Sequence, residues 1–286
     1  MSESEDVKPI FLFADSQILF WREDDELFLE RLRRELPEEN PRAAYIGASN
    51  GDNPVYYEIF EAAMDSIGVT ERRMISSSFG AEDREYLEQA DLVLLAGGGV
   101  ERGWKVIEST GMRDVLAQRH LEGVVLVGVS AGAVQLGWLG FGGDVPKAGR
   151  LVDPLKLVPA IVGVHEEDDQ WRDLRKLMRL SDVPVRGLGI PSGGGLVFHP
   201  DQTVEPVRHP VVEVIEEEGR HKGTLLFPPD EPDEPDEEME IDASEDAENT
   251  PAPKPSPVQR MSTEDVLEQM GGKWIVDVEA GEGKAN

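Results

Sequence analysis

The sequence predicts an α/β fold with a mostly parallel sheet and helices on both faces. Short apolar runs alternate with helical patterns over residues 10–139, which is typical of βαβ units. Glycine-rich turns directly follow two of these runs. A hydrophobic content of 39% is enough for a core in a chain of 286 residues.

Five strands and four helices are expected in this part of the chain. The strands are expected at 10–13, 43–47, 69–75, 91–95 and 124–129. The helices are expected near 24–36, 54–67, 81–90 and 101–118. The helix at 54–67 is the best marked, because Asn53 is a good N-cap, Pro54 suits the first helical position and Gly68 suits the end.

The second half of the chain predicts a helix at 168–180 and then short strands that finish a sheet edge with a hairpin. These strands are expected around 196–198, 204–207, 211–216 and 224–227. Beyond them the chain is rich in Pro, Asp and Glu, a composition that disfavours a packed core. We therefore predict one α/β domain at 1–228, a disordered acidic linker at 229–260 and a short terminal segment of unknown role at 261–286.

The charge balance excludes several classes of partner. The chain has 58 acidic and 28 basic residues, and its net charge of −30 repels nucleic-acid phosphates and anionic membrane surfaces. The absence of cysteine excludes thiol nucleophiles and thiolate metal sites. No apolar run approaches the ~20 residues that span a bilayer, and the acidic N-terminus lacks the features of a secretion signal. We expect a cytoplasmic protein that binds neither nucleic acid nor membrane.

The segment 128–132 reads Gly-Val-Ser-Ala-Gly and lies between an apolar strand and a helix-like segment. This is the context of a G-x-S-x-G nucleophile elbow, in which small neighbours permit the tight turn that exposes the serine hydroxyl. The pattern predicts Ser130 as a nucleophile. A tight structural turn is the alternative interpretation.

A second glycine-rich turn, at 96–99, follows the strand expected at 91–95. The carboxyl ends of parallel strands meet at one edge of the sheet, so this turn is expected to lie near Ser130. We predict the backbone amides of Gly98 and Ala131 as an oxyanion hole. No Lys-Ser or Lys-Thr pair follows the glycines, which excludes a P-loop.

Several blocks together resemble the serine peptidase family of dipeptidase E and cyanophycinase. The blocks are Leu-Leu-Ala-Gly-Gly-Gly at 94–99, Gly-Val-Ser-Ala-Gly-Ala at 128–133, Leu-Val-Pro at 157–159 leading to Val-His at 164–165, and Gly-Leu-Gly-Ile at 187–190 followed by Leu-Val-Phe at 196–198. The resemblance runs from about residue 8 to 208. It implies a three-layer, flavodoxin-like sheet of the class I glutamine amidotransferase type and a Ser-His-acid triad.

The resemblance places the triad on residues of this chain. Ser130 matches the nucleophile and His165 the general base, although Glu166 replaces the aromatic residue that usually follows this histidine. Asp144 matches the acid of the dipeptidase branch, with Glu166 and Glu167 as fallbacks. The cyanophycinase branch would place its acid near 191–192, where this sequence has Pro-Ser.

The resemblance also implies a substrate, namely an amide bond next to an aspartyl residue in a small peptide or a cyanophycin-like polymer. The substrate carboxylate needs a cation, for which we select Arg102 over Lys105, Lys147 and Arg150. A homodimer is expected by analogy. No cofactor is expected. No metal is expected either, because the acidic run at 165–169 is typical of a solvated helix start rather than of a ligand cluster.

Two other functions fit parts of the sequence. A conventional α/β-hydrolase esterase shares the elbow, but its histidine usually follows several further βα units, whereas His165 comes only 35 residues after Ser130. A catalytically degenerate family member that acts as a binding module is favoured by Gly99, Glu166 and the absence of a carboxylate near Ser192. Reaction of Ser130 with a fluorophosphonate separates an enzyme from a binding module.

Overall fold

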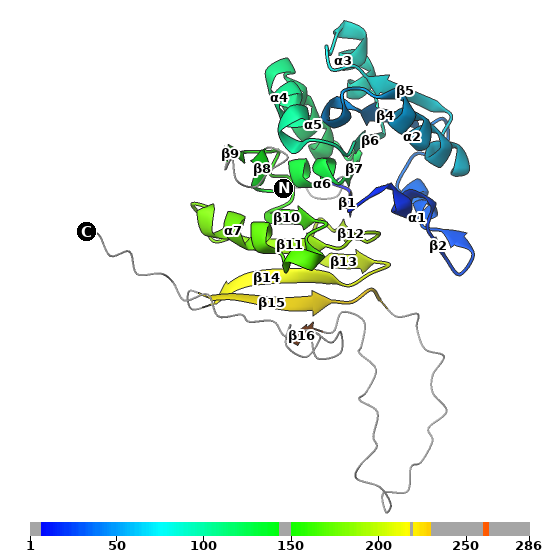
Figure 1. Cartoon of the computed structure of the whole chain (residues 1–286). Helices are drawn as coiled ribbons and strands as arrows, with labels where there is room; N and C mark the ends of the chain where they lie inside the picture. The colour runs from blue at the N-terminus through cyan, green and yellow to red at the C-terminus, as the bar shows by residue number, and fades with distance from the viewer. Residues whose placement is uncertain (1–6, 143–149, 218–219, 230–259, 263–286) are drawn as a thin grey trace, which may run out of the picture.

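The computed structural model describes residues 7–142, 150–217, 220–229 and 260–262. A seven-stranded sheet at its centre confirms the predicted mixed α/β fold (Figure 1). Its order is β13 (Val204–Val207), β12 (Gly195–Phe198), β1 (Ile10–Phe13), β7 (Val125–Val129), β6 (Leu92–Leu95), β4 (Arg42–Ile46) and β5 (Glu71–Ile75). The five strands from β1 to β5 in this order are mutually parallel. β12 is antiparallel to β1, and β13 is antiparallel to β12.

Helices cover both faces of this sheet because alternate strand residues point to opposite sides. Leu95 belongs to a core that also contains residues of α3 (Ala81–Glu88), α4 (Val100–Thr110), α5 (Met112–Leu121) and α6 (Ala131–Leu136). Leu94 belongs to the opposite core, with residues of α1 (Leu29–Arg34) and α2 (Pro54–Ser66). The three-layer arrangement expected from the resemblance is therefore present.

A second sheet, which the sequence did not predict, follows the first (Figure 1). Its order is β10 (Ala160–Val164), β11 (Arg186–Ile190), β14 (Val211–Glu217), β15 (Arg220–Leu226) and β16 (Arg260–Ser262). One face packs on α7 (Arg172–Leu180) and Trp171, and the other shares the core of α3 to α6. The predicted hairpin is thus present as β14 and β15, but it belongs to this second sheet.

Several helix boundaries differ from the sequence-based expectation. The helix expected at 24–36 begins only at Leu29, because β2 (Arg22–Glu23) and β3 (Glu26–Leu27) form a hairpin before it. The helix expected at 101–118 is divided at Gly111, whose φ of +81° ends α4. A 3₁₀ turn, η4 (Glu167–Asp169), precedes α7, so the helix begins at Arg172.

Short elements that carry little hydrophobic periodicity complete the fold. They are η1 (Ser16–Phe20), η2 (Ala48–Asn50), β8 (Gly140–Gly142) and β9 (Arg150–Val152). Most of the predicted linker and terminal segment lies outside the described residues, apart from β16, which pairs with β15. Among the helices that the structure describes, none is both long and apolar enough to cross a bilayer.

Candidate active site

Ser130 stands at the end of β7 in a strained backbone conformation. Its φ and ψ are 50° and −109°, a region that residues other than glycine rarely adopt. Its backbone N–H donates to the carbonyl oxygen of Phe13 at 2.8 Å, and α6 begins at the next residue. The structure therefore confirms the strand, tight turn and helix that the elbow motif predicts.

The glycine at the end of the motif is required by close packing. A Cβ atom on Gly132 would lie 2.0 Å from the carbonyl oxygen of Leu95, at the end of the neighbouring strand β6. Only glycine allows α6 to approach this strand end so closely. This contact brings the elbow and the 96–99 loop together.

The 96–99 loop lies against both the elbow and η2. A Cβ atom on Gly97 would lie 3.4 Å from the Cβ atom of Ser130, so the two residues are in contact distance. Gly98 has a φ of +139°, and a Cβ atom there would lie 2.2 Å from the carbonyl oxygen of Ser49. Gly99 N–H donates to that same oxygen at 2.8 Å. These contacts hold the loop in one conformation beside Ser130.

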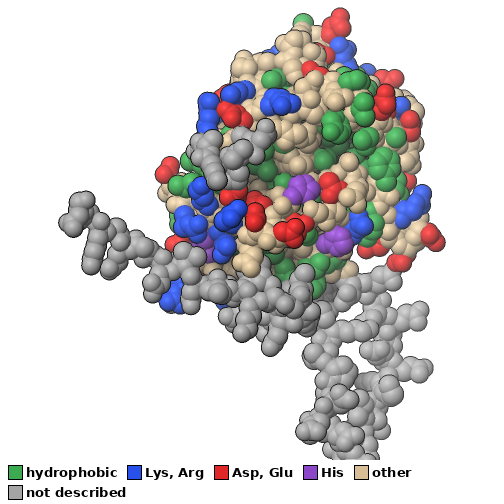
Figure 2. Space-filling model, in the orientation of Figure 1, with side chains coloured by type: hydrophobic (Ala, Val, Ile, Leu, Met, Phe, Trp, Pro, Cys, Tyr) green, Lys and Arg blue, Asp and Glu red, His purple; other side chains and the backbone are tan. Residues whose placement is uncertain are grey.

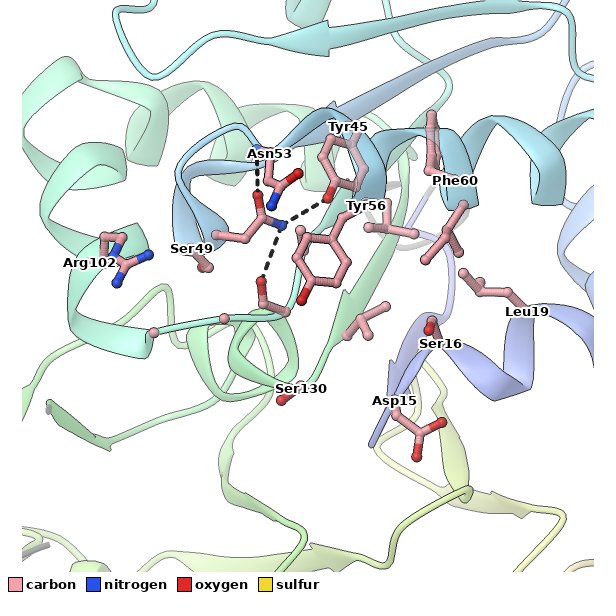
Figure 3. A pocket seen from close by; sticks show the side chains of 18 of the residues that line it. Asp15, Ser16, Leu19, Tyr45, Ser49, Asn53, Tyr56, Phe60, Arg102 and Ser130 are labelled. Carbon is pink, nitrogen blue, oxygen red and sulfur yellow. Dashed lines mark hydrogen bonds between the residues drawn. The ribbon is translucent and has the colours of Figure 1, made fainter. Parts of the chain in front are cut away.

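Asn50 holds the same loop through its side chain. Figure 3 marks hydrogen bonds of the pocket with dashed lines, one of which reaches the labelled Tyr45. Its Nδ2 donates to the carbonyl oxygen of Gly97 at 3.3 Å and to the Tyr45 hydroxyl at 2.9 Å. Its Oδ1 accepts from the backbone N–H of Asn53 at 3.0 Å. The C=O and N–H of a trans peptide point in opposite directions, so the amide of Gly98 faces away from Asn50.

A buried polar pair supports this region from behind. Ser49 and Gln135 are 2% and 1% exposed. Gln135 Nε2 donates to Ser49 Oγ and to the carbonyl oxygen of Val100, both at 3.0 Å. Sequence analysis missed Asn50 and this pair, although a glutamine in the apolar segment 131–136 was a visible signal for a buried hydrogen bond.

His165 follows β10 of the second sheet. Its backbone N–H continues the pairing with β11 by donating to the carbonyl oxygen of Ile190 at 3.3 Å. Its Nδ1 lies 3.0 Å from Oγ of Ser192, which comes shortly after the end of β11. Glu167 Oε1 accepts from the backbone N–H of Ser192 at 3.0 Å. The imidazole thus contacts the hydroxyl of a residue whose backbone N–H is bound by a carboxylate.

The two glutamates after His165 occupy different environments. The Glu166 carboxylate accepts from the backbone N–H groups of Asp173 and Leu174 at 3.1 and 3.0 Å, at the start of α7. Burial, with nearby carboxylates, raises the pKa of Glu166 to about 7. Burial also acts on Glu167, but hydrogen bonds from Ser192 outweigh it and lower the pKa of Glu167. Of the two glutamates, Glu167 is the one that binds Ser192, the residue in contact with the His165 ring.

A pocket with a volume of about 550 Å³ brings the predicted residues together, a size typical of small-molecule sites. Ser130, His165, Gly98 and Arg102 all line it. The rest of the wall combines polar residues with apolar and aromatic ones, which include Leu19, Tyr45, Tyr56, Ile59, Phe60 and Leu94. Figure 2 shows hydrophobic side chains on the α2 side of this face, where Tyr56 is 52% exposed.

Arg102 is the cation of this pocket. In the described part of the chain its guanidinium forms no hydrogen bond or ion pair with another residue. The neighbouring cations differ, because Lys105 and Arg150 contact Glu101 at 2.7 and 3.1 Å. Arg102 is therefore available to a ligand carboxylate.

A comparison with protein families identifies the family of this chain. The model of peptidase family S51 matches residues 11–204. The chain belongs to this family. It is accordingly a serine peptidase, as the sequence blocks predicted. A comparison with curated proteins finds no match.

Two solved structures share the fold of this S51 peptidase. One is a peptidase from an acI-B1 actinobacterium, with a TM-score of 0.52 and 15% identity over 79% of this chain and 93% of the other. The second is a putative peptidase E protein from Listeria monocytogenes EGD-e, with a TM-score of 0.53 and 16% identity over 71% of this chain and 98% of the other. Both support the mixed α/β architecture.

Four of the predicted site residues of the S51 peptidase thus meet in one pocket, and Ala131 follows Ser130 as the first residue of α6. The predicted acid, Asp144, lies outside the described residues. Within 7–142, 150–217, 220–229 and 260–262, no three His, Asp or Glu side chains form a potential metal site.

Proposed function

We propose that the chain hydrolyses an amide bond next to an aspartyl residue, in a small peptide or an Asp-containing polymer. The observation that supports this proposal best is the shared pocket of Ser130, His165, Gly98 and Arg102. A nucleophile, a base, a backbone-amide donor and an uncommitted cation are the groups that this hydrolysis needs.

The reaction begins with the attack of Ser130 Oγ on the scissile carbonyl carbon while His165 accepts the hydroxyl proton. The amides of Gly98 and Ala131 stabilise the negative charge that develops on the carbonyl oxygen. His165 then donates its proton to the leaving amine, and a water molecule releases the acyl group from Ser130. Asp144 stays the predicted acid from the resemblance.

The charges of the pocket favour an acidic substrate near the glycine loop. Arg102 follows this loop on α4 and has a free guanidinium, as described above. Asp15, the carboxylate that lines the pocket, is already engaged, because its oxygens accept from the backbone N–H groups of Gln17 and Gly193 at 2.9 and 2.6 Å. A substrate carboxylate at Arg102 would fix which amide bond reaches Ser130.

Hydrolysis of a panel of Asp-X, isoaspartyl and β-Asp-Arg dipeptides, with Asn-X peptides as uncharged counterparts, tests the proposal. We expect turnover of one aspartyl class and none by Ser130→Ala. If folded wild-type protein hydrolyses no peptide of the panel, the proposed substrate is contradicted, and another acyl substrate or a catalytically inactive site is favoured.

The contribution of Arg102 has a matched control on the same helix. Arg102→Ala should raise KM for the aspartyl substrate at least about tenfold, the range for loss of a charge-assisted hydrogen bond. Lys105→Ala removes an equal charge that is already paired with Glu101, and it should leave KM unchanged. An unchanged KM in Arg102→Ala would remove Arg102 from the proposal.

A further inference from the structure

We propose that Ser192 and Glu167 are positioning residues for His165. Ser192 joins the two, because its hydroxyl contacts the imidazole and its backbone N–H donates to the Glu167 carboxylate. This inference rests on the proposed function, because it concerns the base of the same site. It differs from a triad in which a carboxylate contacts the histidine directly. Its basis is a set of contacts in the second sheet.

The topology places the two residues at neighbouring strand ends. β10 and β11 are adjacent and parallel, and Val164 stands opposite Ile190. His165 follows the first of these residues, and Ser192 comes two positions after the second. The strand pairing therefore sets the 3.0 Å contact between His165 Nδ1 and Ser192 Oγ.

The turn that carries Ser192 is held on both sides. Glu167 Oε1 accepts from the backbone N–H of Ser192 at 3.0 Å. Asp15 Oδ2 accepts from the backbone N–H of Gly193 at 2.6 Å. These charge-assisted bonds fix the position of the hydroxyl before substrate binds.

The direction of the Ser192 hydroxyl proton sets which ring nitrogen of His165 carries a proton. Glu167 has a lowered pKa, since hydrogen bonds from the side chain and backbone of Ser192 outweigh its burial, and an ionised carboxylate only accepts hydrogen bonds. We assign the single hydroxyl proton of Ser192 to Glu167, whose pKa the Ser192 side chain lowers, so that Oγ accepts a bond from Nδ1–H of His165. The lone pair is then on Nε2, as a base for Ser130 requires.

Glu167 also supplies negative charge. Its Oε2 is buried and has no hydrogen-bond partner among the described residues. Its charge and that of a protonated His165 attract each other. The carboxylate therefore stabilises the imidazolium that forms when Ser130 is activated, although it contacts the ring only through Ser192.

The test is the rate at which a fluorophosphonate labels Ser130 in the full chain, measured against pH by intact mass. Ser192→Ala should slow labelling about tenfold or more, short of the roughly 10⁴-fold effect of removing a direct triad acid. Ser192→Thr keeps the hydroxyl and should restore the rate. Glu167→Gln should slow labelling and move the midpoint of its pH profile downward. The exposed neighbour Asp168 provides the matched control Asp168→Asn, which should change neither.

Labelling of folded Ser192→Ala and Glu167→Gln at the wild-type rate across the pH range would overturn the inference. So would a loss of rate in Asp144→Asn with Ser192→Ala unaffected, which would assign the orientation of His165 to Asp144. Wild-type protein that does not label at Ser130 would contradict the proposed function instead. In that case NMR of the His165 ring nitrogens still decides, because the inference requires the proton on Nδ1 and its loss from that atom in Ser192→Ala.

Discussion

Asn50 and Gly97 are joined by a hydrogen bond from the Asn50 side chain to the Gly97 carbonyl oxygen, at 3.3 Å. This bond fixes the plane of the peptide that also carries the Gly98 amide. The orientation of a proposed oxyanion donor thus depends on a side chain from η2. This 3₁₀ turn follows β4, whereas the 96–99 loop that it orients follows β6.

Asn50→Asp should slow the labelling of Ser130 by a fluorophosphonate about tenfold, less than the 10²–10³-fold cost of losing an oxyanion donor altogether. The substitution keeps an acceptor for Asn53 N–H but removes the donor to Gly97. Tyr45→Phe, which removes only the second acceptor of the same amide, is the control and should change the rate little. Equal rates in all three proteins would show that the loop keeps its orientation without Asn50.

The glycine loop offers a second, sterically matched pair. Gly98→Ala should abolish most activity, because the new Cβ would lie 2.2 Å from the carbonyl oxygen of Ser49 and φ is +139°. Gly99→Ala should be tolerated, since its Cβ would have only Arg102 Cβ at 3.6 Å and the Ser49 oxygen at 4.0 Å nearby. Labelling rates and thermal unfolding of both variants check this difference. Similar behaviour of the two would contradict the described loop conformation.

The backbone conformation of Ser130 should lower the stability of the fold. A φ of 50° with a ψ of −109° costs a serine energy that glycine largely avoids. Ser130→Gly should therefore be more stable than Ser130→Ala by about 1 kcal/mol, although both are inactive. Urea unfolding of the two variants measures this difference. A more stable alanine variant would argue against strain at the elbow.

Glu166 should make stability depend on pH. Its folded-state pKa of about 7 lies above the ordinary 4.5, so its contribution to stability is fully present below pH 4.5 and is lost as the pH rises through about 7. The loss is at most about 3 kcal/mol. Glu166→Gln keeps an acceptor for the start of α7 and should remove this part of the pH dependence. Urea unfolding at pH 5 and pH 8 measures it, and parallel losses in both proteins would contradict the raised pKa.

The sequence was sufficient for the first sheet but not for the second. The five parallel strands were predicted within two residues, because apolar runs between helices leave little choice of partner. The strands after 186 are short and alternate in a similar way, so nothing local indicates that β12 and β14 join different sheets. The division at Gly111 was missed because the apolar stripe continues across it.

The sequence also predicts only some of the side chains in the candidate site. Ser130 and His165 have motif or strand-end signals, and the structure brings both to one pocket. The contact between Ser192 and Glu167 depends on a turn anchored by Asp15, which is 178 residues away from Gly193. No spacing rule can predict such a contact, because it arises from the packing of separate elements.

Ser130 follows a strand of the first sheet and His165 follows a strand of the second. The hydrophobic core that lies between the two sheets therefore sets the distance between these residues. Leu136 of α6, Val162 of β10 and Ile190 of β11 are all fully or almost fully buried in that core. Replacing one of them by a smaller residue should change the thickness of the layer between Ser130 and His165. The rate of fluorophosphonate labelling at Ser130 should therefore depend on the volume of these aliphatic side chains, and it should decline before the fold itself fails.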